Sequence, residues 1–86
     1  MNKAPIRIRD LGLITALISV GVPVYGTQNE KEGRVYFLFE NISKNQNYIN
    51  DYWSDKLMVR ARNYSDSMKM LKTRIYSEER NATFRK

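Results

Sequence analysis

The chain has 86 residues and carries 15 Lys or Arg against 9 Asp or Glu, a formal net charge of +6, with no cysteine and no histidine. That length is typical of one small domain. The two missing residue types exclude disulfides, zinc sites built from Cys or His, and catalysis by a Cys or His side chain. The hydrophobic content of 42% is too high for an intrinsically disordered chain. We therefore expect a folded domain with a thin core.

The positive charge is concentrated at the two ends of the chain. Residues 1–9 hold three basic and no acidic residues, residues 10–55 hold three against six, and residues 56–86 hold nine against three. A basic segment attracts phosphates over a long range and releases counterions when it binds them. A run of charges is also typical of a solvated helix face, so charge alone leaves both interpretations open.

A 14-residue segment without charge, residues 11–24, follows the basic N-terminal residues. This order resembles a secretory signal with a cleavage region at 24–26, but Asp10 at its start and Pro23 near its end argue against one. The segment is also shorter than the roughly 20 residues of a membrane-spanning helix. We expect a buried helix followed by the start of a strand, in a protein of the bacterial cytoplasm without membrane contact. A cleaved signal stays open as the alternative.

Hydrophobic periodicity predicts the elements of the first half. Residues 1–9 fit a basic arm or an edge strand, because residues 6–9 alternate apolar and basic side chains. Asp10 is a typical N-cap for a helix to residue 20, and Gly21 ends that helix. Residues 22–25 begin a strand and residues 26–33 form a hairpin loop. Residues 35–39 form the strongest strand, with Phe37 and Phe39 on its core face.

The second half predicts two helices joined by a short segment. Ser43 with Gln46 forms a capping-box pattern that opens the first of them. Residues 56–60 fit a short strand or an extended link, and Asn63 caps the last helix. The apolar positions of that helix recur at helical spacing; they are Tyr64, Met68, Leu71 and Ile75. We predict a single α+β domain over residues 10–79, with about three helices, a β-hairpin and one short extra strand, and a basic tail over residues 80–86.

Six short motifs are the basis of a family resemblance: IRDL at 8–11, glycine at 21, GRVYFLFE at 33–40, DYW at 51–53, VRAR at 59–62 and LKTRIY at 71–76. Together they resemble a small family of uncharacterised domains from Gram-positive bacteria, their phages and other mobile elements. The resemblance covers residues 6–76 and implies a phage or mobile-element setting, but no activity or catalytic residue. Arg60 departs from the family pattern, which is acidic at that position.

The carboxylates offer little for catalysis. Asp51 and Asp55 are four residues apart, so on one helix they would face the same way and could hold Mg²⁺. No further acidic cluster completes such a site, and the sequence has no glycine-rich phosphate loop. We interpret the pair as part of a solvated face and expect a protein that is not an enzyme, with no metal and no cofactor.

The basic last third favours contact with nucleic acid. Long cations bind phosphates, and an exposed ring stacks on a base. The predicted nucleic-acid-binding residues are Lys56, Arg60, Arg62, Lys69, Lys72, Tyr76 and Arg80. No helix-turn-helix, ribbon or finger spacing is present, so we expect no sequence-specific recognition. In this interpretation the chain is a non-catalytic binding protein that contacts nucleic acid or a nucleoprotein complex.

The alternative is a phage-encoded inhibitor or adaptor of a host protein, for example a defence nuclease. Aromatic residues dominate the hot spots of protein interfaces, and Tyr36, Tyr52 and Trp53 are the predicted protein-binding residues. Trp53 is otherwise expected to be a core anchor. Tyr36 and Leu38 share the second face of the central strand, which needs cover from a helix or from a second subunit, so a homodimer stays open.

Overall fold

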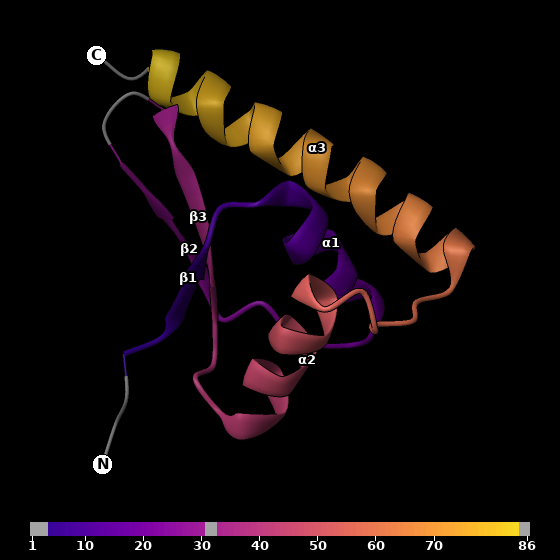
Figure 1. The fold of residues 1–86 in the computed structure, drawn as a ribbon. Helices are drawn as coiled ribbons and strands as arrows, with labels where there is room; N and C mark the ends of the chain where they lie inside the picture. The colour runs from indigo at the N-terminus through magenta and orange to yellow at the C-terminus, as the bar shows by residue number, and fades with distance from the viewer. Residues whose placement is uncertain (1–3, 31–32, 85–86) are drawn as a thin grey trace.

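The fold is a three-stranded antiparallel sheet with its helices on one side (Figure 1). The computed structural model describes residues 4–30 and 33–84, and it describes side chains as far as residue 77. Its elements are β1 (Ile6–Ile8), α1 (Leu11–Ser19), β2 (Gly26–Asn29), β3 (Val35–Phe39), α2 (Ser43–Trp53) and α3 (Ala61–Phe84). The predicted α+β class, with three helices, a hairpin and one further strand, is confirmed.

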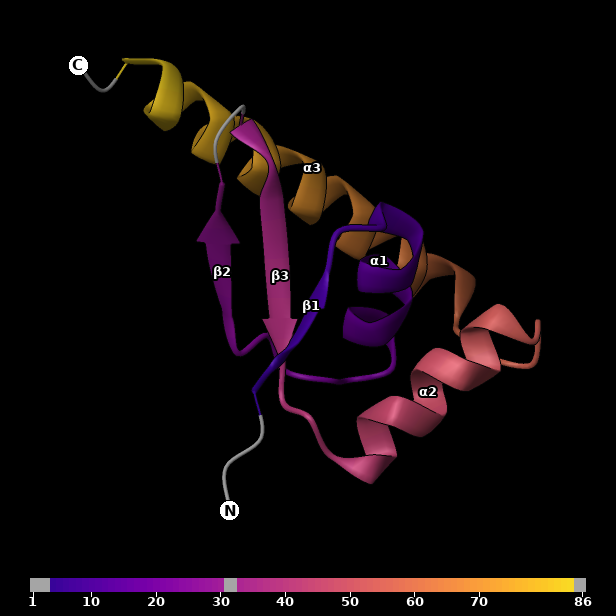
Figure 2. The same ribbon diagram turned by 60° about the vertical axis from the view of Figure 1, so that its left-hand side comes forward.

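Strand β3 is the centre of the sheet and lies between β1 and β2 (Figure 2). Phe37 is opposite Ile8 on one side and Thr27 on the other. Because side chains alternate along a strand, Phe37 and Phe39 both point toward the helices, and neither is exposed to solvent. The prediction that these two rings form the core face of the strand is confirmed.

The predicted boundaries of α1 are confirmed by its caps. Asp10 accepts a hydrogen bond at 3.0 Å from the backbone N–H of Leu13, which satisfies one of the free donors in the first turn. Gly21 adopts a φ of 96°, a left-handed conformation that costs glycine nothing. This turn lets the N–H of Val22 donate to the carbonyl of Leu17 at 3.0 Å, which closes the helix.

The structure decides two open alternatives and corrects one strand position. Residues 56–60, predicted as a short strand or an extended link, form the link and no strand; the extra strand is β1, so the N-terminal segment takes its edge-strand alternative. The strand predicted at 22–25 begins later, and β2 occupies residues 26–29, which were expected to be loop. Hydrophobic patterning does not predict β2 because its residues are polar, yet all four of them pair with β3 through the backbone. Cross-strand hydrogen bonds do not require apolar side chains.

The predicted caps of the later helices are also wrong. Ser43 is already the first residue of α2, Ile42 is the N-cap, and no side chain caps that end. The side chain of Gln46 instead donates to Asn41 Oδ1 at 2.5 Å. Helix α3 begins at Ala61 because the N–H of Tyr64 already donates to the carbonyl of residue 60 at 2.9 Å. The helix continues past residue 79 to residue 84.

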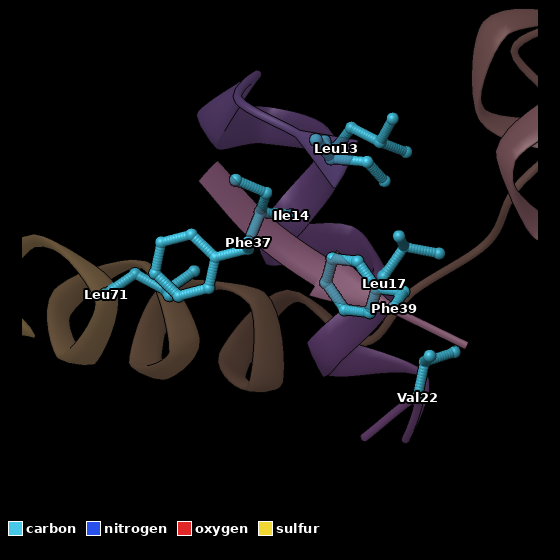
Figure 3. Packing of buried hydrophobic residues seen from close by; sticks show 8 residues of the cluster. Leu13, Ile14, Leu17, Val22, Phe37, Phe39 and Leu71 are labelled. Atoms are coloured by element: carbon cyan, nitrogen blue, oxygen red, sulfur yellow. The ribbon is translucent and has the colours of Figure 1, made fainter. Parts of the chain in front are cut away.

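The core joins α1, β3 and α3. Figure 3 shows the buried side chains, with Leu71 beside the ring of Phe37 and Leu17 near Phe39. Leu71 is 1% exposed and is the one fully buried residue among the described side chains of α3. Partly buried residues of the same stripe, including Ile75, pack around it. Among the described side chains of the long helix, Leu71 therefore makes the most deeply buried contact with the rest of the domain.

A tight junction holds the three helices together at Gly12. A Cβ at this position would lie 2.6 Å from the Tyr52 hydroxyl of α2 and 3.6 Å from the Tyr64 hydroxyl of α3. Burial raises the pKa of Tyr52, and the charges of Asp10 and Tyr64 raise it further. The absence of a side chain at residue 12 therefore makes room for the Tyr52 hydroxyl against α1.

Leu71→Ala should lower the free energy of unfolding by about 2–5 kcal/mol, because it removes a buried side chain and leaves a cavity. The neighbouring residue Met70 is 57% exposed, so Met70→Ala is the matched control and should change stability by less than about 0.5 kcal/mol. Urea unfolding followed by circular dichroism measures both. Equal losses in the two variants would contradict the assignment of Leu71 as the anchor of α3.

Gly12→Ala should destabilise the protein despite the higher helix propensity of alanine, because the new methyl group collides with the Tyr52 hydroxyl. In a Tyr52→Phe background the collision is removed, and the same substitution should cost less by about 1 kcal/mol or more. A double-mutant cycle from urea unfolding measures this coupling. Additive effects of the two substitutions would show that the contact between Gly12 and Tyr52 does not limit the packing.

Candidate nucleic-acid interface

Helix α3 places predicted binding residues on the face that points away from the core. Seven residues make almost two complete turns, so Arg62, Lys69 and Tyr76 follow one line along the helix, with about 10.5 Å between successive Cα atoms. Lys72 lies beside this line. All four side chains are exposed, and the buried Leu71 is on the side of the helix opposite Lys69, with Lys72 between the two sides. We call this surface the α3 ridge (Arg62, Lys69, Lys72 and Tyr76).

The cations of the α3 ridge have no ion-pair partners among the described residues. The part of α3 whose side chains are described holds four cations, of which Arg74 is one, against the single carboxylate of Asp66. Asp66 is exposed and pairs with none of them. With respect to the described side chains, the ridge therefore presents uncompensated positive charge along one helix, which also carries the exposed ring of Tyr76 (66% exposed).

Three predicted cations, Lys56, Arg60 and Arg80, are not part of the α3 ridge. Lys56 and Arg60 are exposed in the link between α2 and α3, and the carbonyl of Arg60 accepts the first hydrogen bond of α3. They therefore extend the positive surface around the first turn of the helix. Arg80 falls outside the described side chains, although its backbone is helical.

Arg74 differs from the other described cations of α3 because its guanidinium contacts a core ring. Its guanidinium carbon lies 5.6 Å from the centre of the Phe37 ring, within the range of a cation–π contact. Arg74 is three residues after Leu71, so it flanks the buried stripe. The contact with Phe37 distinguishes Arg74 from the cations of the α3 ridge; helical spacing alone does not, because Lys72 also flanks the buried stripe, four residues after Met68.

Trp53 is not a core anchor, so that prediction is wrong. The indole is 63% exposed and meets Tyr52 edge-on, with ring centres 5.0 Å apart. The contacts of α2 with the core use Tyr48, Ile49 and Tyr52. Trp53 is the last residue of the helix and projects beyond that face. Tyr36, the third aromatic residue predicted to bind protein, is partly buried on the far side of the sheet beneath Arg7.

The acidic pair does not lie on one helix. Helix α2 ends at Trp53, and Asp55 follows with a φ of 62°, a left-handed conformation. Its carboxylate therefore does not stack one turn above that of Asp51. Within residues 4–30 and 33–84, no group of three or more Asp, Glu, His or Cys side chains is placed to hold a metal ion.

One groove lies away from the α3 ridge, and the sequence carries no motif that marks it. It has a volume of about 270 Å³ and is bounded by residues 20–25 and by the start of α2. Most of its lining is apolar, including Val22 and Ile42, with Glu40 and Lys44 as its charged residues. The buried side chain of Asn45 is already satisfied, since it donates to the Glu40 carbonyl at 2.8 Å. These groups supply no catalytic constellation.

The fold and the charge distribution define a small α+β domain with one exposed basic helix. The chain belongs to the family described as a domain of unknown function, DUF5659, whose model matches residues 3–77. The expected membership of an uncharacterised family is thus confirmed. No curated protein matches the chain, and no solved structure does. Among the described residues, no helix is both long and apolar enough to span a membrane.

Trp53→Ala should lower the free energy of unfolding by less than about 1.5 kcal/mol, since only its edge contact with Tyr52 is lost. A buried indole would cost about 3–5 kcal/mol. Circular dichroism must follow the urea unfolding, because Trp53 is the single tryptophan of the chain. A loss in the larger range would contradict the exposed position of this side chain.

Proposed function

We propose that this protein is a non-catalytic binding module that contacts nucleic acid, alone or in a nucleoprotein complex, through the α3 ridge. The observation that carries the proposal is a line of exposed cations on one rigid helix, none of them paired with a carboxylate among the described residues. Unpaired cations bind phosphates at low cost, because no internal ion pair has to be broken.

The composition of the α3 ridge supports binding to the backbone rather than reading of a sequence. Lys69 and Lys72 are point charges on long stems, which suit phosphate contacts that carry no base information. Tyr76 offers a ring for stacking on a base or a sugar. A long straight helix with spaced cations follows a phosphate backbone, and we propose binding with strong salt dependence and weak sequence preference.

The setting that we propose is the bacterial cytoplasm, in a phage or mobile-element system. The family resemblance supports this context, and the net charge of +6 supports a polyanionic partner. The same charge argues against mimicry of DNA, which requires a dense anionic surface.

Lys69→Glu combined with Lys72→Glu should abolish most binding to duplex DNA at about 50 mM salt, because it replaces two phosphate contacts by repulsion. The slope of log affinity against log salt should fall in magnitude by about 2. Both side chains are exposed, so the melting temperature should stay nearly unchanged. Fluorescence anisotropy with a labelled duplex, repeated at rising salt, measures affinity and slope.

A matched control separates the α3 ridge from the total charge of the protein. Lys44 lies on α2. Lys44→Glu changes the net charge of the protein as much as Lys69→Glu does, since each replaces one cation by one anion. Lys69→Glu alone should weaken binding several-fold more than Lys44→Glu. Equal losses would show that the net charge, and not the ridge, drives binding. No binding of the wild-type protein at about 50 mM salt would remove the proposal.

The second candidate function is an inhibitor or adaptor of a host protein. A specific observation favours it: Trp53 and Met58, five residues apart, are 63% and 85% exposed, and Trp is among the residues that dominate the hot spots of protein interfaces. Pull-down from nuclease-treated host lysate distinguishes the two functions, because a partner bound through nucleic acid is lost on digestion. A partner retained by the wild-type protein but lost by Trp53→Ala would support direct protein binding.

A further inference from the structure

The sheet has a second face that no described helix covers (Figure 1). Alternation along the strands assigns Tyr36 and Leu38 of β3 to this face, together with Arg7 of β1 and Gln28 of β2, which lie opposite them in the ladders. Tyr36 occupies the central strand, with a neighbouring strand on each side. The open face therefore carries one aromatic ring on its central strand.

An arginine side chain covers this ring, and a second arginine follows directly after β1. The guanidinium of Arg7 lies over Tyr36, with its carbon 4.3 Å from the ring centre, and it donates to Glu30 Oε2 at 2.7 Å. Arg9 follows β1 with the same parity as Arg7, which puts it across from Tyr36 if the register continues. Arg9 is exposed and has no ion-pair partner in the described part of the chain.

We propose that this open sheet face is a second binding surface, and that its ligand is single-stranded nucleic acid. Unpaired bases stack on aromatic rings and on guanidinium planes, whereas the bases of a duplex are already stacked on each other. Tyr36 with Arg7 supplies the stacking surface, and Arg9 supplies a free cation for the adjacent phosphate. No described helix lies over this face, so a nucleic-acid strand can run across β3.

The net charge of the chain favours this ligand over a second copy. A copy carries the same net charge of +6, which opposes association of two chains and favours a polyanion, although the open face itself also carries the carboxylates of Glu30 and Glu40 beside its arginines. The Arg7–Glu30 ion pair is exposed on both sides, so it holds the guanidinium over the ring at little energetic cost if a ligand displaces it. The open sheet face shares no residue with the α3 ridge.

The test measures binding of a labelled oligodeoxythymidylate of about 12 nucleotides by fluorescence anisotropy at low salt. Tyr36→Leu should weaken binding about tenfold, because it keeps an apolar side chain but removes the aromatic stack. Tyr36→Phe is the matched control and should bind within about twofold of wild type. Arg9→Gln, at an exposed position, should weaken binding and reduce the magnitude of the salt slope by about 1. Unchanged affinity in both Tyr36→Leu and Arg9→Gln would overturn the proposal.

A direct signal comes from an indole placed at the proposed site. In the Trp53→Phe background, Tyr36→Trp introduces the single tryptophan on the open face, and its fluorescence should be quenched when a base stacks on it. The parent protein, whose one tryptophan is Trp53 on α2, should show no comparable quenching. Equal quenching of both proteins, or none in the Tyr36→Trp protein, would contradict stacking at this face.

The two binding proposals fail in different ways. The variant with Lys69→Glu and Lys72→Glu should lose duplex binding but still bind single strands, and adding Tyr36→Leu to it should weaken that single-strand binding. The variant with Tyr36→Leu alone should keep duplex binding. Single-strand binding that depends on Lys69 and Lys72 but not on Tyr36 would assign it to the α3 ridge and overturn the inference. A concentration-dependent dimer in sedimentation, abolished by Tyr36→Leu, would show a second copy on the sheet face and would also overturn it.

Discussion

The burial of one face of β3 is the constraint on which the rest of the structure depends. Phe37 and Phe39 are fully buried beneath α1 and Leu71 of α3. The three described helices all lie on this side of the sheet. Two outer surfaces follow from this arrangement: the exposed side of α3 and the open face of the sheet. Both surfaces considered for binding are consequences of how the core is covered.

The position of a cation relative to the core decides its role. Arg74 flanks the buried stripe of α3 and lies over Phe37, whereas Lys69 is on the opposite side of the same helix and pairs with no carboxylate of the described residues. Arg7 lies over Tyr36 and pairs with Glu30, whereas Arg9 makes neither contact within the part of the chain that the structure describes. The net charge does not reveal these differences. A cation that stabilises the fold and a cation available to a ligand each add one positive charge to the total.

Much of the α3 ridge could be predicted from the sequence, because a long helix with apolar residues at regular spacing defines its own exposed side. The position of Trp53 could not be predicted in that way. Its spacing from Tyr48 and Ile49 places it at the margin of the apolar stripe of α2, and only the end of the helix at Trp53 leaves the ring outside. Aromatic character does not distinguish a core anchor from a contact residue at such a margin.

The sequence alone determined the local features: the cap at Asp10, the left-handed turn at Gly21, the core face of residues 35–39 and the exposed side of α3. Each depends on residues close together in the chain, so spacing predicts it. Only the tertiary structure decided that residues 6–8 and 26–29 pair with β3, that 56–60 does not, and that one sheet face stays open. Strand pairing joins distant segments through backbone hydrogen bonds, which carry little signature in the side chains.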